Sequence, residues 1–431
     1  MSLNVLIVGA GVCGPAFAML LQRSNPKHKI TILERSPTLR MGGQQIDLKN
    51  QAPHILRQMG LLDVIKSRCV DETGLEMVDS NDKTIARFGV APAGQRRLTL
   101  TSEHEIMRGD MVQVLYDASI KQNQDSKANS EDPDAGLRYV FGQTIVALDQ
   151  RENDDVDVTF SNGETKRYDL VVGADGQWSH TRSLAFGKET SRTAFKSLGI
   201  HAAYFSLPKT ENEATLAKGH LAPGRRMVFT RTSGRPVTGA LLFTMQNSAK
   251  LSSCYRESTE KQKEAFAEAF RDIDWQAERF ISGLKSSSDF YAHELGQIKM
   301  EELSSGRVVL LGDSGYCPSP FTGLGTNLCL VGSYILAGEL ARHGSSNISE
   351  ALHSYGDKMR PFIDECQSIS PRTLGLFFPS SRLGIWVMHS LAWAISSLSQ
   401  RFWQRQEDLT DHHAERLPKY PELNLPFQSQ F

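Results

Sequence analysis

The chain lacks the cysteine spacing of a metal cage or a disulfide framework. Its six cysteines are irregularly spaced over 431 residues and form no CxxC pair. Buried free thiols in a reducing compartment are therefore expected. No signal peptide is visible, because the apolar run at 5–8 is too short for a signal core and leads directly into glycines. We expect a cytoplasmic protein without a metal site.

An excess of either charge and a long apolar run are also missing. The 48 Lys and Arg and 49 Asp and Glu give a formal net charge of -1, so no global basic field draws the chain to nucleic acid. The most apolar stretch, 383–396, is shorter than the ~20 residues that span a bilayer. We expect a helix packed across two domains there. Peripheral membrane contact through Trp386, Trp393 and Trp403 is the alternative.

What is present is the composition of a globular protein, with 40% hydrophobic and 23% charged residues in a length that suits two or three units sharing a core. Hydrophobic periodicity predicts an α/β (α+β overall) fold. The strands are expected at 3–8, 29–33, 140–148, 156–160, 169–172, 199–207, 227–232, 237–245 and 307–312, and an antiparallel hairpin region at 75–101. The helices are expected at 15–23, 51–67, 106–120, 258–283 and 324–342, and a solvated loop at 121–136.

The first motif is Gly9-Ala10-Gly11-Val12-Cys13-Gly14, which lies between a buried strand and a helix. A second strand ends at Glu34, twenty residues after Gly14, the spacing of a ribose-binding carboxylate. Gly9 permits the tight turn, Gly11 lets a pyrophosphate approach the backbone, and Gly14 lets helix and strand pack closely. A carboxylate at Glu34 would repel a 2′-phosphate, so NADP is a poor candidate here. The motif alone leaves FAD and NAD open.

Two later segments repeat the pattern of an apolar strand that ends in glycine and is followed by aspartate. They read Asp-Leu-Val-Val-Gly-Ala-Asp-Gly-Gln-Trp-Ser-His-Thr-Arg at 169–182 and Arg-Val-Val-Leu-Leu-Gly-Asp-Ser-Gly-Tyr-Cys-Pro-Ser-Pro-Phe-Thr-Gly-Leu-Gly-Thr-Asn at 307–327. A carboxylate at the C-terminal end of a parallel strand is where an α/β sheet holds its ligand. These segments therefore predict two more parts of the nucleotide site.

Together, the three motifs resemble the group A flavoprotein monooxygenases, the para-hydroxybenzoate hydroxylase family, over nearly the whole chain. The likeness is most evident to tetracycline-inactivating flavin monooxygenases and to tailoring hydroxylases of natural-product pathways. The resemblance implies FAD, with NADPH or NADH as a transient co-substrate, since no second GxGxxG follows. It also implies that a flavin hydroperoxide inserts one oxygen atom from O2 into an aromatic or polycyclic small molecule.

The resemblance also implies the cofactor contacts. The first motif and Glu34 would hold the ADP half of FAD, Asp175 would serve FAD and NAD(P)H, and Asp313 would lie near the ribityl chain. The full implied set is Gly9, Gly11, Val12, Cys13, Gly14, Glu34, Arg35, Arg40, Arg108, Asp175, Asp313, Pro320, Gly323, Gly325, Thr326 and Asn327. One departure is Gly-Asp-Ser-Gly-Tyr at 312–316, where the family has Gly-Asp-Ala-Ala-His. We expect FAD binding to survive this change and Tyr316 to alter the local packing.

No catalytic side chain is assigned, because the flavin carries the chemistry. Substrate candidates lie on the middle strands and on one polar loop, and strand alternation would place some of them on one sheet face. They are Gln45, His201, Tyr204, Arg226, Met227, Phe229 and Phe243.

The resemblance implies a Rossmann-like FAD-binding domain (1–74, 105–186 and 296–345) interleaved with a β-sheet substrate domain (75–104 and 187–295), followed by C-terminal helices (346–431). Baeyer–Villiger oxidation or epoxidation on the same scaffold, an FAD-linked reductase and a non-catalytic flavin-binding protein stay open. A flavin-dependent halogenase is set aside, because the sequence has no Trp-x-Trp-x-Ile-Pro stretch.

Overall fold

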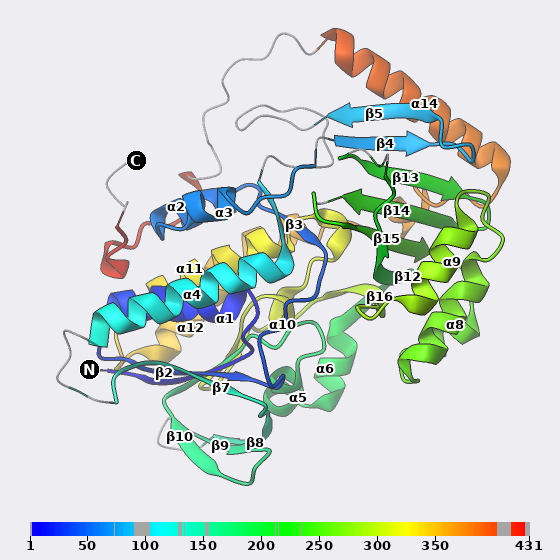
Figure 1. Cartoon of the computed structure of the whole chain (residues 1–431). Helices are drawn as coiled ribbons and strands as arrows, with labels where there is room; N and C mark the ends of the chain where they lie inside the picture. The colour runs from blue at the N-terminus through cyan, green and yellow to red at the C-terminus, as the bar shows by residue number, and fades with distance from the viewer. Residues whose placement is uncertain are drawn as a thin grey trace.

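Two large β-sheets organise the chain, which we describe from a computed structural model (Figure 1). The structure describes residues 2–72, 74–89, 104–127, 132, 134–150, 155–211, 213, 215–232, 234–402 and 415–426, with the side chains of 399–402 left out. The predicted mixed α/β fold is confirmed.

The first sheet has six strands, of which five run parallel. Residues 5–8 are apolar and are buried on both faces, as in a central parallel strand. A short antiparallel strand closes one edge. In spatial order the strands are β17 (Ser304–Ser305), β18 (Val308–Leu310), β11 (Leu170–Gly173), β1 (Asn4–Val8), β2 (Lys29–Glu34) and β7 (Gly136–Phe141).

Both faces of this sheet are covered. Val5 and Ile7 of β1 pack into the core beneath the helices, whereas Leu6 and Val8 face a small antiparallel sheet. The helices on the first face are α1 (Cys13–Ser24), α2 (Ala52–Gln58), α3 (Leu62–Lys66), α4 (Arg108–Lys127), α11 (Gly325–His343) and α12 (Ile348–Cys366). On the other face lie β8 (Ile145–Gln150), β9 (Val156–Phe160), β10 (Thr165–Tyr168) and α5 (His180–Phe186), with α6 (Lys188–Ala194) beyond.

The second sheet has seven strands and is mainly antiparallel. In spatial order they are β16 (Tyr291–Ile298), β12 (Phe195–Pro208), β15 (Val237–Thr244), β14 (Arg226–Thr232), β13 (Ala217–Ala222), β4 (Gly74–Val78) and β5 (Thr84–Gly89). One face packs on α7 (Ala249–Cys254), α8 (Thr259–Phe270) and α9 (Ala277–Ser286). Strand alternation sends Ala203 and Phe205 of β12 to these helices and Tyr204 to the opposite face.

The remaining elements join the two sheets or end the chain. They are β3 (Gln45–Asp47) paired with β6 (Glu105–Met107), α10 (Asp313–Tyr316), η1 (Pro320–Thr322), α13 (Pro371–Gly375), α14 (Arg382–Phe402) and η2 (Pro421–Leu423). Helix α14 packs against β5 and β13 at the edge of the seven-stranded sheet (Figure 1). Among the described residues, no helix has the length and apolarity to cross a membrane.

The structure corrects the prediction of a loop at 121–136. Helix α4 continues to Lys127, although this stretch has no apolar periodicity. Hydrogen bonds replace apolar packing, because Gln122 Nε2 donates to Met19 O at 2.9 Å and Asn123 Nδ2 donates to Leu137 O at 2.9 Å. Asn123 is buried at the junction of α1, α4 and β7. Tertiary contacts thus lengthen a helix that the local sequence does not favour.

Two other predicted helices are each divided. The helix expected at 51–67 breaks at Gly60, which has a φ of +78°, and the helix expected at 258–283 breaks before Gln276. Residues 90–101 of the predicted hairpin region lie outside the described residues, as does Trp403. The domain boundaries stay a prediction. All six cysteines lie among the described residues and none is in a disulfide, and four of them are buried.

Candidate active site

A cavity of about 510 Å³ lies where the two sheets meet, a size typical of small-molecule sites. It is lined by the turn after β1, by β3, by the segments that follow β11 and β18, and by the exposed face of the seven-stranded sheet. Among the predicted cofactor residues, the cavity brings together Gly11, Val12, Cys13, Arg108, Asp313, Pro320, Gly323, Gly325 and Thr326. Gly9, Gly14, Glu34, Arg35, Arg40, Asp175 and Asn327 are not part of its lining.

The glycines of the first turn differ in what a side chain would meet. A Cβ at Gly9, where φ is +117°, would lie 2.3 Å from Ala174 O, and one at Gly14 would lie 2.1 Å from Gly9 O. A Cβ at Gly11 would meet only Arg108 Nη2, at 3.6 Å. Packing therefore requires glycine at the first and third positions, while the second opens onto the cavity. The start of α1 has no side-chain cap, so its N–H groups are available to an anion.

Glu34 is the last residue of β2, and its side chain holds the glycine turn in place through a hydrogen bond. Its Oε2 accepts a hydrogen bond from Ala10 N at 3.0 Å, and its Oε1 accepts one from Ser36 N at 3.0 Å. Each carboxylate oxygen has a second lone pair, so these bonds leave acceptor capacity for a ribose hydroxyl. Arg35 and Arg40 are exposed.

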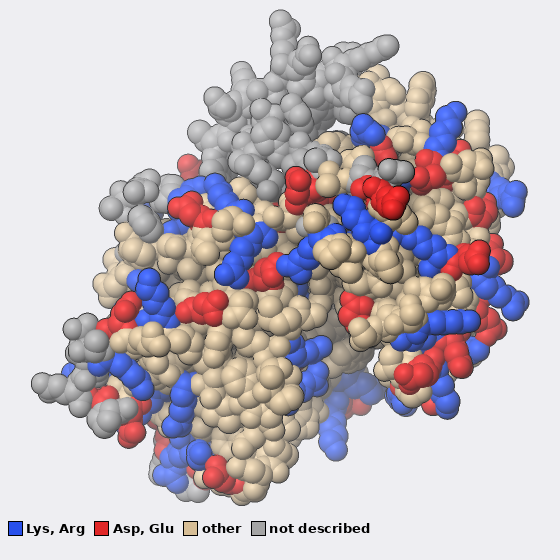
Figure 2. Space-filling view, in the orientation of Figure 1, with Lys and Arg blue, Asp and Glu red and all other residues tan. Residues whose placement is uncertain are grey.

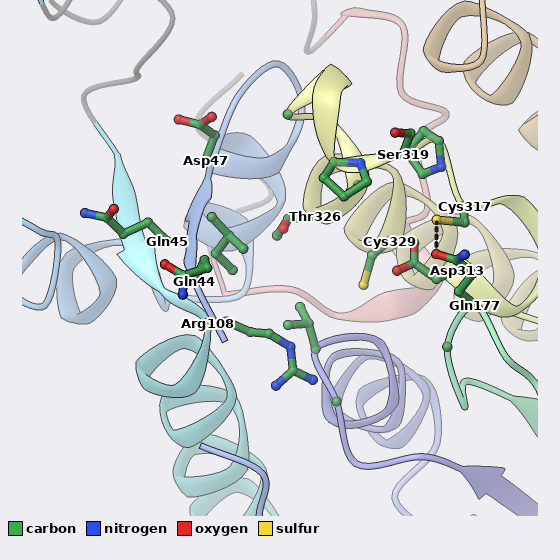
Figure 3. Close-up of a pocket in the computed structure, with 18 of the residues that line it drawn as sticks. Gln44, Gln45, Asp47, Arg108, Gln177, Asp313, Cys317, Ser319, Thr326 and Cys329 are labelled. Carbon is green, nitrogen blue, oxygen red and sulfur yellow. Dashed lines mark hydrogen bonds between the residues drawn. The ribbon is translucent and has the colours of Figure 1, made fainter. Parts of the chain in front are cut away.

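Arg108 and Asp313 approach the cavity from opposite sides (Figure 3). Arg108 Nη1 donates to Arg40 O at 3.2 Å and to Gly42 O at 3.1 Å, which fixes the loop before β3. Asp313 follows β18, and its exposed side chain lines the cavity. Burial raises the pKa of Asp313, and the Cys317 thiol and Arg108 oppose that shift. Burial likewise lowers the pKa of Arg108.

Asp175 and Asn327 hold local structure. Asp175 Oδ2 accepts from Thr181 N at 2.9 Å at the start of α5, and its Oδ1 accepts from Ser179 Oγ at 2.5 Å. Gly176, beside it, lines the cavity with a φ of +83°. Asn327 Oδ1 accepts from Ala52 N at 2.9 Å and so ties α11 to α2.

A second helix N-terminus opens on the cavity at α11. Its first turn has no side-chain cap, and Gly325 and Thr326 line the space. The preceding chain is strained at Ser319, where a residue with a side chain has a φ of +86°. Gly323 has a φ of +64°, and a Cβ there would approach Asp47 Oδ2 to 3.2 Å. This segment therefore packs closely on the Asp47 side chain where both line the cavity.

Tyr316, which replaces the family histidine, points into the core and away from the cavity. Its hydroxyl lies 2.9 Å from that of Tyr355, which donates to Leu310 O at 3.0 Å. A Cβ at Gly332 would lie 2.0 Å from Tyr316 Oη, so the glycine makes room for the larger ring. The substitution is accommodated by packing between α10, α11 and α12.

The seven-stranded sheet contributes an aromatic wall to the cavity. Tyr204 stacks on Tyr291, with ring centroids 4.7 Å apart, and on His293 at 5.6 Å, while Phe243 meets Tyr204 edge-on at 5.9 Å. Burial lowers the pKa of His293 to about 4 and raises that of Tyr204. The imidazole and the phenol are therefore uncharged at neutral pH. Gln45 also lines the cavity, and Met227 and Phe229 pack in the same cluster as Phe243.

His201 and Arg226 do not reach the cavity, and we remove them from the candidate substrate site. His201 Nδ1 lies 2.7 Å from Tyr255 Oη, and Arg226 Nη1 donates to Ala269 O at 2.9 Å and contacts Asp272. His201 lies on the opposite face of the sheet from Tyr204, and Arg226 lies on the opposite face from Met227. His201 is three residues from Tyr204 and Arg226 is adjacent to Met227, so the two-residue period separates them.

Sequence reasoning missed Arg231, Tyr291, His293 and Asp47, all of which line the cavity. The signal for Arg231 was available, because it follows Phe229 by two residues on the same strand and so shares its face. Tyr291 and His293 alternate in the same way on β16.

Arg231 joins a buried network of carboxylates. Its Nη2 lies 2.7 Å from Glu72 Oε1 and also bonds Glu105, while Asp47 pairs with Lys49 Nζ at 3.0 Å. Burial raises the pKa of Glu105 to about 7, and Asp47 and Glu72 add to the rise against the opposing effect of Arg231. More carboxylates than cations therefore meet at this wall.

The free energy of unfolding is expected to fall as pH rises from about 4.5 to about 7 because of Glu105. Within that window the folded chain binds more protons at Glu105 than the unfolded chain does, which gives a slope of up to about 1.4 kcal/mol per pH unit. Glu105→Gln should flatten this slope in urea unfolding measured across the window. Glu350→Gln, at an exposed position of α12, is the control, and an unchanged slope in Glu105→Gln would contradict the assignment.

Comparison with known proteins agrees with this geometry. The family model described as an FAD binding domain matches residues 2–368. The FAD-dependent monooxygenase asL6 of Sarocladium schorii is 40% identical over 99% of this chain and 100% of its own length. A flavin-dependent monooxygenase of Legionella longbeachae is 31% identical over 90% of each chain. The crystal structure of tetracycline destructase Tet(55) superposes with a TM-score of 0.74 at 25% identity, covering 97% of this chain and 99% of that one.

These matches confirm the resemblance to flavin monooxygenases and the expectation of FAD as cofactor. The family model extends over the glycine turn, both later aspartates and the whole seven-stranded sheet, so it includes every residue that lines the cavity. Full-length relatives have the same named activity. We conclude that this chain belongs to the FAD-dependent monooxygenases that are built on the FAD binding domain.

Proposed function

We propose that the chain uses NADPH or NADH to insert one oxygen atom from O2 into a planar aromatic or polycyclic small molecule. The observation that carries this proposal is the aromatic wall of Tyr204, Phe243, Tyr291 and His293, which faces the predicted cofactor residues across one cavity. Stacked rings favour flat, apolar ligands. The structural similarity to tetracycline destructase Tet(55) supports a polycyclic substrate, since tetracycline is itself polycyclic.

The residues present fit FAD. Gly11 leaves backbone open at an uncapped helix start, where a pyrophosphate would accept N–H hydrogen bonds. Asp313 would accept hydrogen bonds from the ribityl chain of FAD, and the segment from Pro320 to Thr326 would face the isoalloxazine ring. When bound, FAD supplies the reaction with O2 that the side chains themselves cannot perform.

The protein's own contribution is binding, orientation and exclusion of water. Arg108 presents a cation to the cofactor side of the cavity. The uncapped N-terminus of α11 contributes a positive electrostatic potential there, which would stabilise negative charge on the bound cofactor. On the substrate side, His293 is neutral and can exchange a hydrogen bond with a substrate hydroxyl. The surrounding rings keep this part of the cavity apolar.

The deciding experiment is a turnover assay on the purified flavoprotein. Aromatic and polycyclic compounds are screened for faster NADPH or NADH oxidation, coupled to O2 uptake and product mass. A product heavier by one oxygen atom supports the proposal, and its structure separates hydroxylation or epoxidation from Baeyer–Villiger oxidation. Turnover without O2 would indicate an FAD-linked reductase, and absence of turnover with every ligand would favour a non-catalytic flavin-binding protein.

Tyr204→Leu is expected to raise KM for the substrate found in this screen by about 2- to 10-fold, since an aromatic pair contributes about 0.5–1.5 kcal/mol beyond its buried area. Flavin content should not change. His201→Asn on the same strand but the opposite face is the matched control and should leave KM as in the parent protein. Equal effects of the two variants would argue against substrate contact at Tyr204.

A further inference from the structure

Helix α14 exposes an apolar face that continues onto the segment before it. The large apolar side chains on this face are 43–71% exposed: Leu376, Phe377, Leu383, Trp386, Val387, Leu391, Trp393, Ile395 and Leu398. They are a majority of the exposed large apolar side chains among the described residues. Exposed patches of this extent mark interaction sites. We call this set the α14 face.

The α14 face is distinct from the side of the helix that packs on the protein. Ile385 and Met388 pack into the cluster behind the cavity, and the helix contacts β5 and β13. The exposed residues lie around the other half of the helix, which is therefore apolar on both sides. Over 21 residues the face is about 30 Å long.

The chemistry of the α14 face offers little that a specific protein partner could pair with. No Asp, Glu, Lys or Arg occurs between Arg382 and Arg401. The Ser390 hydroxyl forms a hydrogen bond within the helix, since its Oγ donates to Trp386 O at 2.8 Å. Protein interfaces usually carry hydrogen bonds and a polar rim that set orientation. Between Leu383 and Leu398 the exposed large side chains are all apolar, so the face offers a protein partner few hydrogen bonds.

Three features favour a lipid surface. Trp386 and Trp393 are seven residues apart, so both rings lie along one edge of the helix, as interfacial tryptophans do. Arg372 and Arg382 are exposed at the N-terminal end, where they complement anionic headgroups. The rest of the viewed surface has interspersed Lys, Arg, Asp and Glu (Figure 2).

The α14 face also adjoins the substrate cavity. Phe378 is buried directly after exposed Phe377, and its ring lies 6.0 Å from that of Phe321, which lines the cavity. An apolar path of side chains therefore connects the surface with the aromatic wall.

We propose that the α14 face docks the protein onto an anionic lipid surface, with α14 lying in the interfacial plane. The helix does not cross the bilayer. Its apolar residues insert among the headgroups and acyl chains while the other side stays packed on the seven-stranded sheet. This inference concerns a surface outside the cavity and holds whatever the substrate is.

The test is cosedimentation of the FAD-loaded full chain with vesicles of phosphatidylcholine alone and of equal parts phosphatidylcholine and phosphatidylserine. We expect binding to the mixed vesicles, with a blue shift of tryptophan emission. The triple variant Trp386→Gln, Leu391→Gln, Trp393→Gln should bind at least about tenfold more weakly, the loss expected if only one of the three side chains inserted fully and contributed about 1.5 kcal/mol. Its flavin content and thermal unfolding should match the parent. Val64→Gln with Val146→Gln, exposed elsewhere, is the matched control.

Arg372→Gln with Arg382→Gln gives a second test and should weaken binding to the mixed vesicles only. The proposal is overturned if the parent protein binds neither vesicle, or if the triple variant binds as well as the parent. The proposal is also overturned if the parent protein is a dimer, the triple variant is a monomer, and both bind vesicles equally. The α14 face would then join two copies of the chain.

Discussion

Asp313→Ala is expected to weaken FAD binding by roughly 10- to 150-fold, the cost of about 1.5–3 kcal/mol for one hydrogen bond to a charged group. The carboxyl group projects into the cavity from the end of β18, opposite Arg108. The side chain is exposed to the cavity, so its removal leaves no void in the packed core of the flavin-free protein. The alanine variant should therefore lose flavin without losing thermal stability in the flavin-free state.

The measurement is flavin absorbance per protein after purification, followed by titration with FAD and calorimetric unfolding of the flavin-free chain. Asp364→Ala, at an exposed position of α12, is the control and should bind FAD as the parent does. Full flavin retention by Asp313→Ala would contradict the role proposed for this carboxylate. Loss of flavin together with a large loss of stability would instead assign Asp313 to the fold.

Gly11→Leu is expected to fold normally and to bind FAD at least about 100-fold more weakly. A Cβ at Gly11 would meet only Arg108 Nη2, at 3.6 Å, so a larger side chain can be accommodated only by filling the cavity. It would displace a pyrophosphate from the N–H groups at the start of α1, and losing two such bonds at about 1.5–3 kcal/mol each gives that factor.

Gly14→Ala supplies the contrast on the same turn. Its Cβ would lie 2.1 Å from Gly9 O, so this variant should lower the unfolding temperature of the flavin-free protein, whereas Gly11→Leu should not. Gly356→Leu, on α12 with no atom within 4 Å of a Cβ, controls for adding a leucine. If Gly11→Leu retained FAD at the parent's affinity, the phosphate could not lie at this turn.

The nucleotide half of the site could be predicted because its signals are local. The glycine turn, the strand before it and the helix after it need only neighbouring residues to adopt their geometry. The carboxylates at the ends of β11 and β18 could also be placed near the site, since parallel strands bring their C-terminal ends to one edge of a sheet. Of these two, however, Asp175 uses its oxygens to cap α5, whereas Asp313 faces the cavity. Local sequence does not distinguish a capping carboxylate from a ligand-facing one.

The substrate half was decided by tertiary structure. Strand alternation in the sequence determines that Tyr204 and His201 lie on opposite faces of β12, and that Arg231 shares a face with Phe229. Which face forms the cavity depends on where α8 and α9 pack, and α8 begins 58 residues after His201 and 28 residues after Arg231. The extension of α4 to Lys127 likewise needs partners on α1 and β7. The sequence by itself therefore determined the chemistry of the cofactor and the periodicity of each strand, while long-range packing decided which side chains meet the substrate.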